Sequence, residues 1–284
     1  MRFVNGRRGA TVPLDGGETE TAMQVHQIER DVFHLLGERY ESGTLAVIDG
    51  DRALLVDGMG SMADAARLRE VVTVEWGKRV ALLVSTHYFS DHLAAWNLFP
   101  DTPVLAQENA LATFWTEDFR SPEEAAHFRR PTMLLSGRLE LSWGRHTIEV
   151  FENPGHTAGT LNVDLPAADL LHVGDTAVGR MAYLRYSAPE AIDRALARAQ
   201  QRGRRRVMRS HGRVADASVL ASARGYLDNL RARVFEARRG HGRVRAIAIE
   251  DCLPPGPAAT AFESFFHARN LASIEERGLY PEAA

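Results

Sequence analysis

Potential metal ligands follow four predicted strands of this chain, each at the point where the strand ends. The first of these strands, at residues 80–84, is an almost purely apolar run of β-forming residues, which is typical of a buried strand. Strand ends of a sandwich can converge on one edge, so four separate loops can bring side chains to a single point. Imidazole and carboxylate groups suit zinc and related divalent ions. The candidate ligands are His87, Asp91, His92, His156, Asp175 and His211.

The predicted elements follow one another in an order typical of two sheets with helices outside. Short strands come first, then alternating strands and helices, then strands again, and finally helices. Strands are predicted at residues 32–36, 45–48, 53–56, 80–84, 104–106, 132–135, 139–141, 147–151, 161–165, 170–173 and 206–208. Helices are predicted at 63–75, from 91, from 109, and at 189–202, 218–240, 257–270 and 271–277. We therefore predict an α/β fold in which two sheets pack together between outer helices.

The chain divides into three predicted parts. Residues 1–24 are rich in glycine, threonine and charged residues, and we expect a flexible N-terminal arm. Residues 25–217 carry the strands and the candidate ligands, so they form the predicted core. Residues 218–284 are predicted to be helical and to pack on that core. We interpret these last helices as a surface for homodimer formation or as a border of the substrate entrance.

Charge and cysteine content narrow the classes of partner and compartment. The formal net charge is −3 and the pI is about 6.4, so no basic excess favours nucleic acid or an anionic membrane as partner. The arginine-rich stretch 202–206 is short, and we interpret it as a solvated surface. The chain has a single cysteine, no apolar leader at its start and no apolar run of membrane-spanning length. We therefore expect a cytoplasmic protein that acts on a small molecule.

The four clusters and one earlier segment form a specific pattern. Their sequences are Thr-His-Tyr-Phe-Ser-Asp-His at 86–92, Gly-His-Thr at 155–157, Gly-Asp at 174–175 and Ser-His-Gly at 210–212, preceded by Leu-Leu-Val-Asp-Gly at 54–58. In this order and strand context, the set resembles the metallo-β-lactamase superfamily. The resemblance covers residues 32–214. It implies a four-layer αββα sandwich with a C-terminal helical elaboration.

The resemblance also implies two metal subsites. The first would draw on His87, His156 and the bridging Asp175. The second would draw on Asp91, His92, Asp175 and His211. Where the family usually has a second histidine, this chain has Phe89, whose side chain offers no lone pair. We therefore expect a well-occupied second subsite and a weak or empty first one, with one or two zinc ions bound in total.

A metal-dependent hydrolase is the function that the resemblance implies. The bound metal would lower the pKa of a water and supply the nucleophile, and Asp91 and His87 are the candidates to orient that water or act as general base. We predict cleavage of an ester, thioester, lactone or amide bond in a small molecule. The predicted substrate contacts are Phe89, Tyr88, Arg180, Tyr183 and Arg185. Either arginine could hold a substrate carboxylate in a bidentate pair.

Phe89 also leaves a non-hydrolytic alternative open. His87, His156 and Asp175 could mimic a two-histidine, one-carboxylate iron site, which would indicate a mononuclear redox enzyme in biosynthesis or cofactor maturation. A metal-poor binding protein is a further alternative. Chelator-sensitive activity restored by zinc would favour hydrolysis, whereas iron-dependent oxygen consumption would favour redox chemistry.

Overall fold

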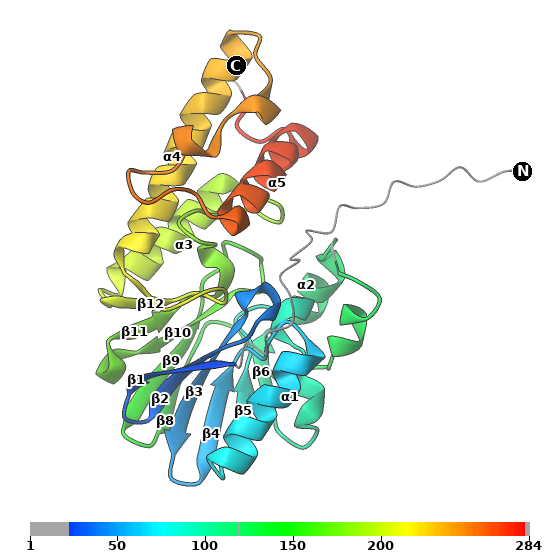
Figure 1. The fold of residues 1–284 in the computed structure, drawn as a ribbon, viewed down its shortest axis with the longest axis vertical. Helices are drawn as coiled ribbons and strands as arrows, with labels where there is room; N and C mark the ends of the chain where they lie inside the picture. Colours follow the sequence, from blue (N-terminus) through cyan, green and yellow to red (C-terminus); the bar gives the residue numbers. More distant parts are fainter. Residues whose placement is uncertain (1–22, 119, 282–284) are drawn as a thin grey trace, which may run out of the picture.

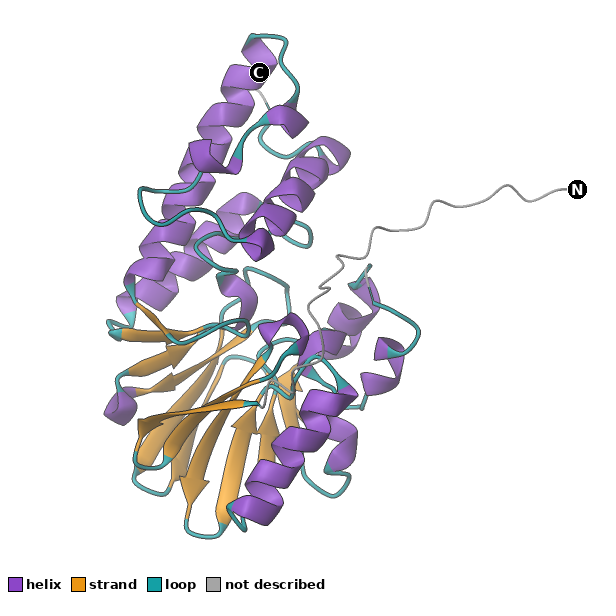
Figure 2. Cartoon of the chain, viewed as in Figure 1, coloured by secondary structure: helices purple, strands orange, loops and turns teal. Residues whose placement is uncertain are grey.

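Two β-sheets pack face to face at the centre of the molecule, with helices on their outer faces (Figures 1 and 2). The computed structural model describes residues 23–118 and 120–281. The predicted N-terminal arm, residues 1–24, therefore lies almost wholly outside the described residues. Among the described residues, no helix combines the length and apolar character needed to cross a lipid bilayer.

The first sheet has seven strands in chain order, antiparallel from β1 to β4 and parallel from β4 to β7. Its strands are β1 (Gln24–Glu29), β2 (Val32–Leu36), β3 (Gly43–Asp49), β4 (Arg52–Val56), β5 (Arg79–Val84), β6 (Val104–Gln107) and β7 (Met133–Leu135). The second sheet has six strands in the order β13-β12-β11-β10-β9-β8. These are β8 (Arg138–Trp143), β9 (His146–Glu152), β10 (Leu161–Leu165), β11 (Leu170–His172), β12 (Arg206–Met208) and β13 (Ala215–Asp216).

Alternation along the strands builds separate cores on the two faces of each sheet. In β4, Leu54 and Val56 join the core between the sheets, whereas Ala53 and Leu55 join the core beneath the outer helices. All four side chains are fully buried. Full burial of a leucine or valine contributes roughly 1.5–3 kcal/mol to folding, so β4 is held firmly from both sides.

The described part of the chain has five α-helices, four of which pack on the sheets. They are α1 (Met62–Glu70), α2 (Ala110–Thr116), α3 (Pro189–Gln201), α4 (Ser218–Arg239) and α5 (Ala261–Arg277). Apolar residues of α1 and α2 pack on the outer face of the first sheet, and those of α3 and α4 on that of the second. Figure 1 shows α4 and α5 beside α3, extending beyond one end of the sheets. The four-layer αββα sandwich with a C-terminal helical elaboration is therefore present.

Several predicted elements differ from the structure. Strand β1 was not predicted, because it lies at the edge of its sheet and none of its residues is buried. The helix predicted from residue 91 is wrong. Two 3₁₀ turns, Ser90–His92 and Trp96–Leu98, occupy this segment instead. The Ser90 amide and hydroxyl both donate to the Glu117 carboxylate, at 2.9 and 2.6 Å, which fixes the segment outside a continuous helix.

At the C-terminus, the two predicted helices at 257–270 and 271–277 are one helix, α5. It begins later than predicted, after a capping box in which the Thr260 hydroxyl accepts from the Glu263 amide while the Glu263 carboxylate accepts from the Thr260 amide. This reciprocal pair satisfies two backbone N–H groups at the start of the helix. The start of α5 is therefore set by Thr260 and Glu263, not by the proline at 257.

The arginine-rich stretch 202–206 lies against acidic side chains. Asp164 accepts from two of its arginines, and Asp169 and Glu29 each pair with one of the others. Each arginine of the stretch therefore has a carboxylate partner.

Candidate metal centre

All six candidate ligands meet at one edge of the sandwich. His87, Asp91 and His92 lie in the loop that follows β5, while His156 follows β9, Asp175 follows β11 and His211 follows β12. Every one of these residues is buried. The convergence of strand ends therefore brings together side chains that are up to 124 residues apart in the sequence.

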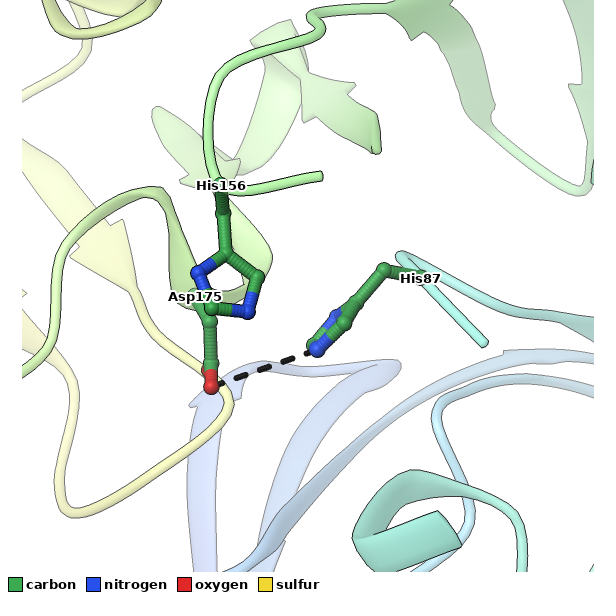
Figure 3. Close-up of side chains that lie close together, drawn as sticks. All are labelled: His87, His156 and Asp175. Atoms are coloured by element: carbon green, nitrogen blue, oxygen red, sulfur yellow. Dashed lines mark ion pairs between the residues drawn. The ribbon is translucent and has the colours of Figure 1, made fainter. Parts of the chain in front are cut away.

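The ligands form two groups, and within each group the potential ligand atoms lie within 4.8 Å of one another. The first group is His87, His156 and Asp175 (Figure 3). The second group is Asp91, His92 and His211. These are the two sets that the sequence pattern predicted, apart from the shared aspartate.

Asp175 lies between the two groups. Its Oδ2 atom is 4.0 Å from His87 Nε2 in the first group. The same oxygen is 3.8 Å from His92 Nε2 and 3.3 Å from His211 Nε2 in the second. One carboxylate oxygen therefore faces both groups, which is the placement expected of a bridging ligand.

Buried polar atoms without hydrogen-bond partners show that the cluster fits a metal ion. Among the described residues, His87 Nε2, both ring nitrogens of His92 and of His156, Asp91 Oδ1 and Asp175 Oδ1 are buried without a hydrogen-bond partner, although His92 Nε2 and Asp91 Oδ1 lie 3.2 Å apart. An unpaired polar atom in a protein interior costs about 1–3 kcal/mol, so several at one point are unfavourable unless something binds them. Nitrogen and carboxylate donors in this number suit zinc or a similar divalent ion.

Protonation differs between the two groups. Burial lowers the pKa of His87 well below its usual value and that of His156 to about 4, so both imidazoles are neutral and able to bind a cation. Burial would lower the pKa of His211 too, but the carboxylates of Asp175 and Asp91 raise it well above its usual value. In the metal-free chain, a proton on His211 therefore supplies the positive charge that these two aspartates require.

Both aspartates are ionised. Burial opposes the ionisation of Asp91, yet His92 and His211 lower its pKa to about 2. Burial likewise opposes ionisation of Asp175, and His211 and His92 lower its pKa well below the usual range. Two buried carboxylates on either side of His211 Nε2, at 3.4 and 3.3 Å, give the second group a strong negative potential.

Hydrogen bonds behind the ligands fix their orientation. His211 Nδ1 lies 2.8 Å from the Tyr40 carbonyl oxygen and donates to it, which turns Nε2 towards the two aspartates. Tyr40 and the next residue, Glu41, have φ values of 61° and 49°, a left-handed conformation that is unfavourable for residues other than glycine. This strained turn brings the accepting carbonyl to His211.

Asp57 connects two of the ligand-bearing loops. Its carboxylate accepts from the Thr86 amide at 2.8 Å, the Thr86 hydroxyl at 2.7 Å and the Ser210 hydroxyl at 3.0 Å. Thr86 and Ser210 immediately precede His87 and His211 in the chain. Asp57 is therefore placed to support the loops that carry His87 and His211, and not to act as a ligand itself.

Gly174 shows why a glycine precedes the bridging aspartate. Its φ is +58°, and a Cβ atom at this position would lie 2.9 Å from the side chain of Thr86. Only glycine meets both requirements without strain. The turn that presents Asp175 therefore depends on the Gly-Asp pair.

Two of the predicted substrate contacts, Phe89 and Tyr88, lie on opposite sides of the backbone. The Phe89 ring centroid is 5.0 Å from that of His87 and 5.5 Å from that of His156, so Phe89 borders the first group. Tyr88 does not border the centre. Its ring lies in the core beneath α1 and α2, and its hydroxyl donates to the Arg129 carbonyl. Successive side chains of extended backbone point in opposite directions, which is why only one of the two faces the ligands.

The predicted arginine contacts already have carboxylate partners. Arg180 binds the Glu263 carboxylate of α5 through Nε and Nη2, both at 3.0 Å. Arg185 binds Asp118 at 2.7 Å and Glu276 at 2.6 Å. These ion pairs connect the loop after Asp175 to α5 and to the segment after α2. Both arginines therefore connect parts of the protein to one another.

Four further aromatic residues lie near the centre, and one of them is a predicted substrate contact. Tyr183 was predicted, and its ring centroid lies 6.2 Å from that of His156. Tyr186 packs on Phe89 at 4.7 Å, and Phe262 of α5 lies 5.5 Å from His211. Phe266 follows Phe262 one turn later on α5 and contacts both Phe262 and Tyr183.

Comparisons with known proteins agree with this architecture. The family model described as metallo-beta-lactamase superfamily matches residues 37–231. Among solved structures, a metallo-beta-lactamase from Pontibacter korlensis is 23% identical, with a TM-score of 0.62, covering 73% of this chain and 99% of that one. DIM-1 metallo-beta-lactamase is 21% identical, with a TM-score of 0.60, covering 72% of this chain and 97% of that one. Among curated protein sequences, none matches the chain significantly.

The family model spans more than half of the chain and contains all six candidate ligands, and the solved structures share the fold at low identity. The chain therefore belongs to the metallo-β-lactamase superfamily.

Proposed function

We propose that this protein is a zinc-dependent hydrolase that cleaves an ester, thioester, lactone or amide bond of a small molecule. The observation that carries the proposal is the convergence of six buried residues with potential ligand atoms, several of which have no hydrogen-bond partner. Four imidazoles and two carboxylates at one point match zinc better than calcium or magnesium, which prefer oxygen ligands.

The second group is the stronger candidate for a resident ion. Asp91, His92 and His211, together with Asp175, supply four donors, two of them charged. The first group supplies His87, His156 and the same Asp175, and Phe89 stands beside it without a donor atom. We therefore propose one tightly bound zinc ion per chain in the second group.

The side chains of the centre have separate roles in this proposal. A bound zinc ion supplies Lewis acidity and lowers the pKa of a water molecule towards neutrality. Asp91 is ionised, so it can accept a hydrogen bond from the attacking water and orient it. His87 is neutral, and its unpaired Nε2 atom faces the cluster, so it can accept the proton of that water. Asp57 and Tyr40 keep the ligands in place.

A mononuclear iron enzyme is the second candidate. His87, His156 and Asp175 form a compact two-histidine, one-carboxylate group, which is the ligand set that non-haem iron often uses. Under this alternative, the first group would hold the metal and the reaction would consume oxygen.

Metal analysis combined with an activity panel tests the proposal. Purified protein is analysed by elemental mass spectrometry and then assayed with ester, thioester, lactone and amide substrates before and after chelation. We expect about one zinc per chain and hydrolysis that chelator abolishes and zinc restores. His211→Ala should lose both, whereas His267→Ala should keep both, because His267 is a buried histidine outside the two groups that bonds Tyr226 and Ile247.

The other outcomes are equally informative. Iron in place of zinc, with oxygen consumption, would favour the redox candidate. A chain that binds no metal under any loading condition would exclude hydrolysis by this centre and leave a binding function.

A further inference from the structure

Five aromatic rings form a continuous arc beside the metal centre. In order they are Phe262, Phe266, Tyr183, Tyr186 and Phe89, and we call them the aromatic arc. Neighbouring ring centroids are separated by 4.8, 4.9, 5.8 and 4.7 Å along this order. Phe262 lies 5.5 Å from His211, and Phe89 lies 5.0 Å from His87. The arc therefore runs from a ligand of the second group to a ligand of the first.

Three separate segments contribute to the arc. Phe262 and Phe266 are one turn apart on α5, so both project from the same face of that helix. Tyr183 and Tyr186 come from the loop after Asp175, and Phe89 comes from the loop after β5. A single apolar surface built from such distant segments is more than local packing within one element.

The hydroxyl groups of the two tyrosines in the arc form hydrogen bonds with residues outside it. The Tyr183 hydroxyl accepts from Arg269 Nε at 2.8 Å, and the Tyr186 hydroxyl donates to Asp118 at 2.7 Å. Both tyrosines therefore present aromatic carbon, not a hydroxyl, to the rest of the arc. Three arginines lie close by, and each has a carboxylate partner. They are Arg180 with Glu263, Arg185 with Asp118 and Glu276, and Arg269 with Asp118.

Accessibility shows the side from which a substrate can reach the ligands. Asp91, Asp175 and His211 are 8%, 7% and 5% exposed, whereas His87, His92 and His156 are only 1–2% exposed. The open side of the cluster is therefore that of the second group's carboxylates and His211, next to Phe262. Phe262, Phe266 and Tyr186 are partly exposed, while Phe89 and Tyr183 are buried behind them.

We propose that the exposed rings of the aromatic arc bind an uncharged, apolar acyl or aryl group of the substrate, adjacent to the bond that is cleaved. This inference rests on the proposed function, because it assigns the substrate class of the same centre. The reacting carbonyl would approach on the side of Asp91 and His211, and the apolar group would lie along Phe262, Phe266 and Tyr186. Apolar surface removed from water at these rings supplies the binding free energy.

The proposal differs from the contacts expected from sequence. The sequence predicts that Arg180 or Arg185 holds a substrate carboxylate. In the structure both guanidinium groups bind carboxylates of the protein, and a substrate anion would have to replace Glu263 or Asp118. An aromatic surface with its cations already paired favours an uncharged group over an anionic one.

Binding of carboxylate probes to the zinc-supplemented protein tests the proposal without any need for turnover. The probes are acetate, octanoate and octanedioate, measured by isothermal titration calorimetry. All three present one carboxylate to the metal, and they differ only in what extends from it. We expect octanoate to bind about 50-fold more tightly than acetate, because each buried methylene strengthens binding roughly fourfold and about half of the chain stays in water. Octanedioate should bind at least tenfold more weakly than octanoate.

Substitutions on α5 locate the effect. Phe262→Ala and Phe266→Ala should each weaken octanoate binding about fivefold to tenfold and change acetate binding by less than twofold. Trp115→Ala is the control, because Trp115 is an aromatic residue that is 64% exposed and packs on Phe114 and Phe128 outside the arc. It should leave all three constants unchanged. Phe262→Leu should keep most of the octanoate affinity.

Each alternative result overturns the proposal. Equal affinity for acetate and octanoate, or no measurable octanoate binding, would show that the arc is only a packing contact. Tighter binding of octanedioate would show that arginine, and not the arc, selects the substrate. These results can be separated from those of the hydrolase test. If the chain binds octanoate as expected but cleaves no substrate, the role of the arc stands and the hydrolase assignment fails. If it cleaves esters without any preference for chain length, the hydrolase assignment stands and the role of the arc fails.

Discussion

The two ligand groups lie side by side but differ in charge and in surroundings. In the second group, His211 lies between Asp91 and Asp175, at 3.4 and 3.3 Å. In the first group, Asp175 is the only carboxylate, and its Oδ2 atom lies 4.0 Å from Nε2 of His87. The neutral imidazoles of His87 and His156 are bordered by the ring of Phe89. The second group also has the more exposed ligands.

Under the proposed function, this difference divides one centre between metal binding and substrate selection. A divalent cation gains most where buried negative charge is otherwise unbalanced, which is the second group. At the first group, a phenyl ring stands where a further imidazole nitrogen would complete the ligand set. That ring is also the last member of the aromatic arc, so under our proposal the residue that adds no donor atom to the first group extends the apolar surface.

Removing the shared aspartate should have the largest effect. Asp175→Asn takes a charge from both groups, and we expect zinc affinity to fall at least about 100-fold and hydrolysis to be lost with it. Asp169→Asn is the control, since Asp169 is half-buried and pairs with Arg205 far from the centre. Zinc titration against a competing chelator measures the change. Unaltered affinity in Asp175→Asn would show that Asp175 is not a ligand.

A histidine in place of Phe89 should strengthen the weaker group. Phe89→His places a nitrogen donor beside His87 and His156, so zinc content should rise from about one towards two ions per chain. Tyr88→Phe is the control, because it removes only a hydroxyl bound to the Arg129 carbonyl in the core. Elemental mass spectrometry gives the stoichiometry. If Phe89→His still binds one zinc, the absence of a donor atom at residue 89 is not what limits zinc binding in the first group.

Proton release should distinguish the groups further. The raised pKa of His211 means that the metal-free second group holds a proton at neutral pH, which zinc must displace. Zinc affinity of this group should therefore fall as the pH decreases. His156, with a pKa of about 4, is already neutral above pH 5 and adds no such dependence. Calorimetry at pH 7 in buffers of different ionisation enthalpy should show about one proton released for the first zinc bound. Binding without proton release would contradict the assignment of that ion to the second group.

The sequence was sufficient to predict the ligand cluster and the fold around it, because the signals are local. An apolar strand followed by ligand residues, and a glycine whose left-handed φ presents Asp175, can both be recognised within a few residues. The same is true of most strands, whose alternation indicates two buried faces. A family pattern then gives the order in which the loops meet.

The surroundings of the cluster could not be predicted, because they depend on distant partners. The partner of Arg180 is Glu263, 83 residues later, and Phe262 reaches His211 only because α5 packs beside the loop after Asp175. Similarly, the 3₁₀ turn at Ser90 depends on Glu117, 27 residues away. The phenylalanines at 262, 265 and 266 indicate an apolar face of a helix, yet nothing local tells which surface that face will contact.

The smallest expected effect concerns the start of α5, which borders only the second group. Thr260→Ala removes the hydroxyl that caps this helix and should lower the free energy of unfolding by about 1 kcal/mol. Ser264→Ala is the control, because its exposed hydroxyl only donates to the Thr260 carbonyl and caps no amide. Urea denaturation measures both. Zinc affinity should change less than threefold, since α5 approaches His211 through the ring of Phe262 and provides no ligand. A tenfold loss of zinc affinity in Thr260→Ala would instead show that α5 holds His211 in position, and the second group would then depend on the C-terminal region for its geometry as well as for its apolar border.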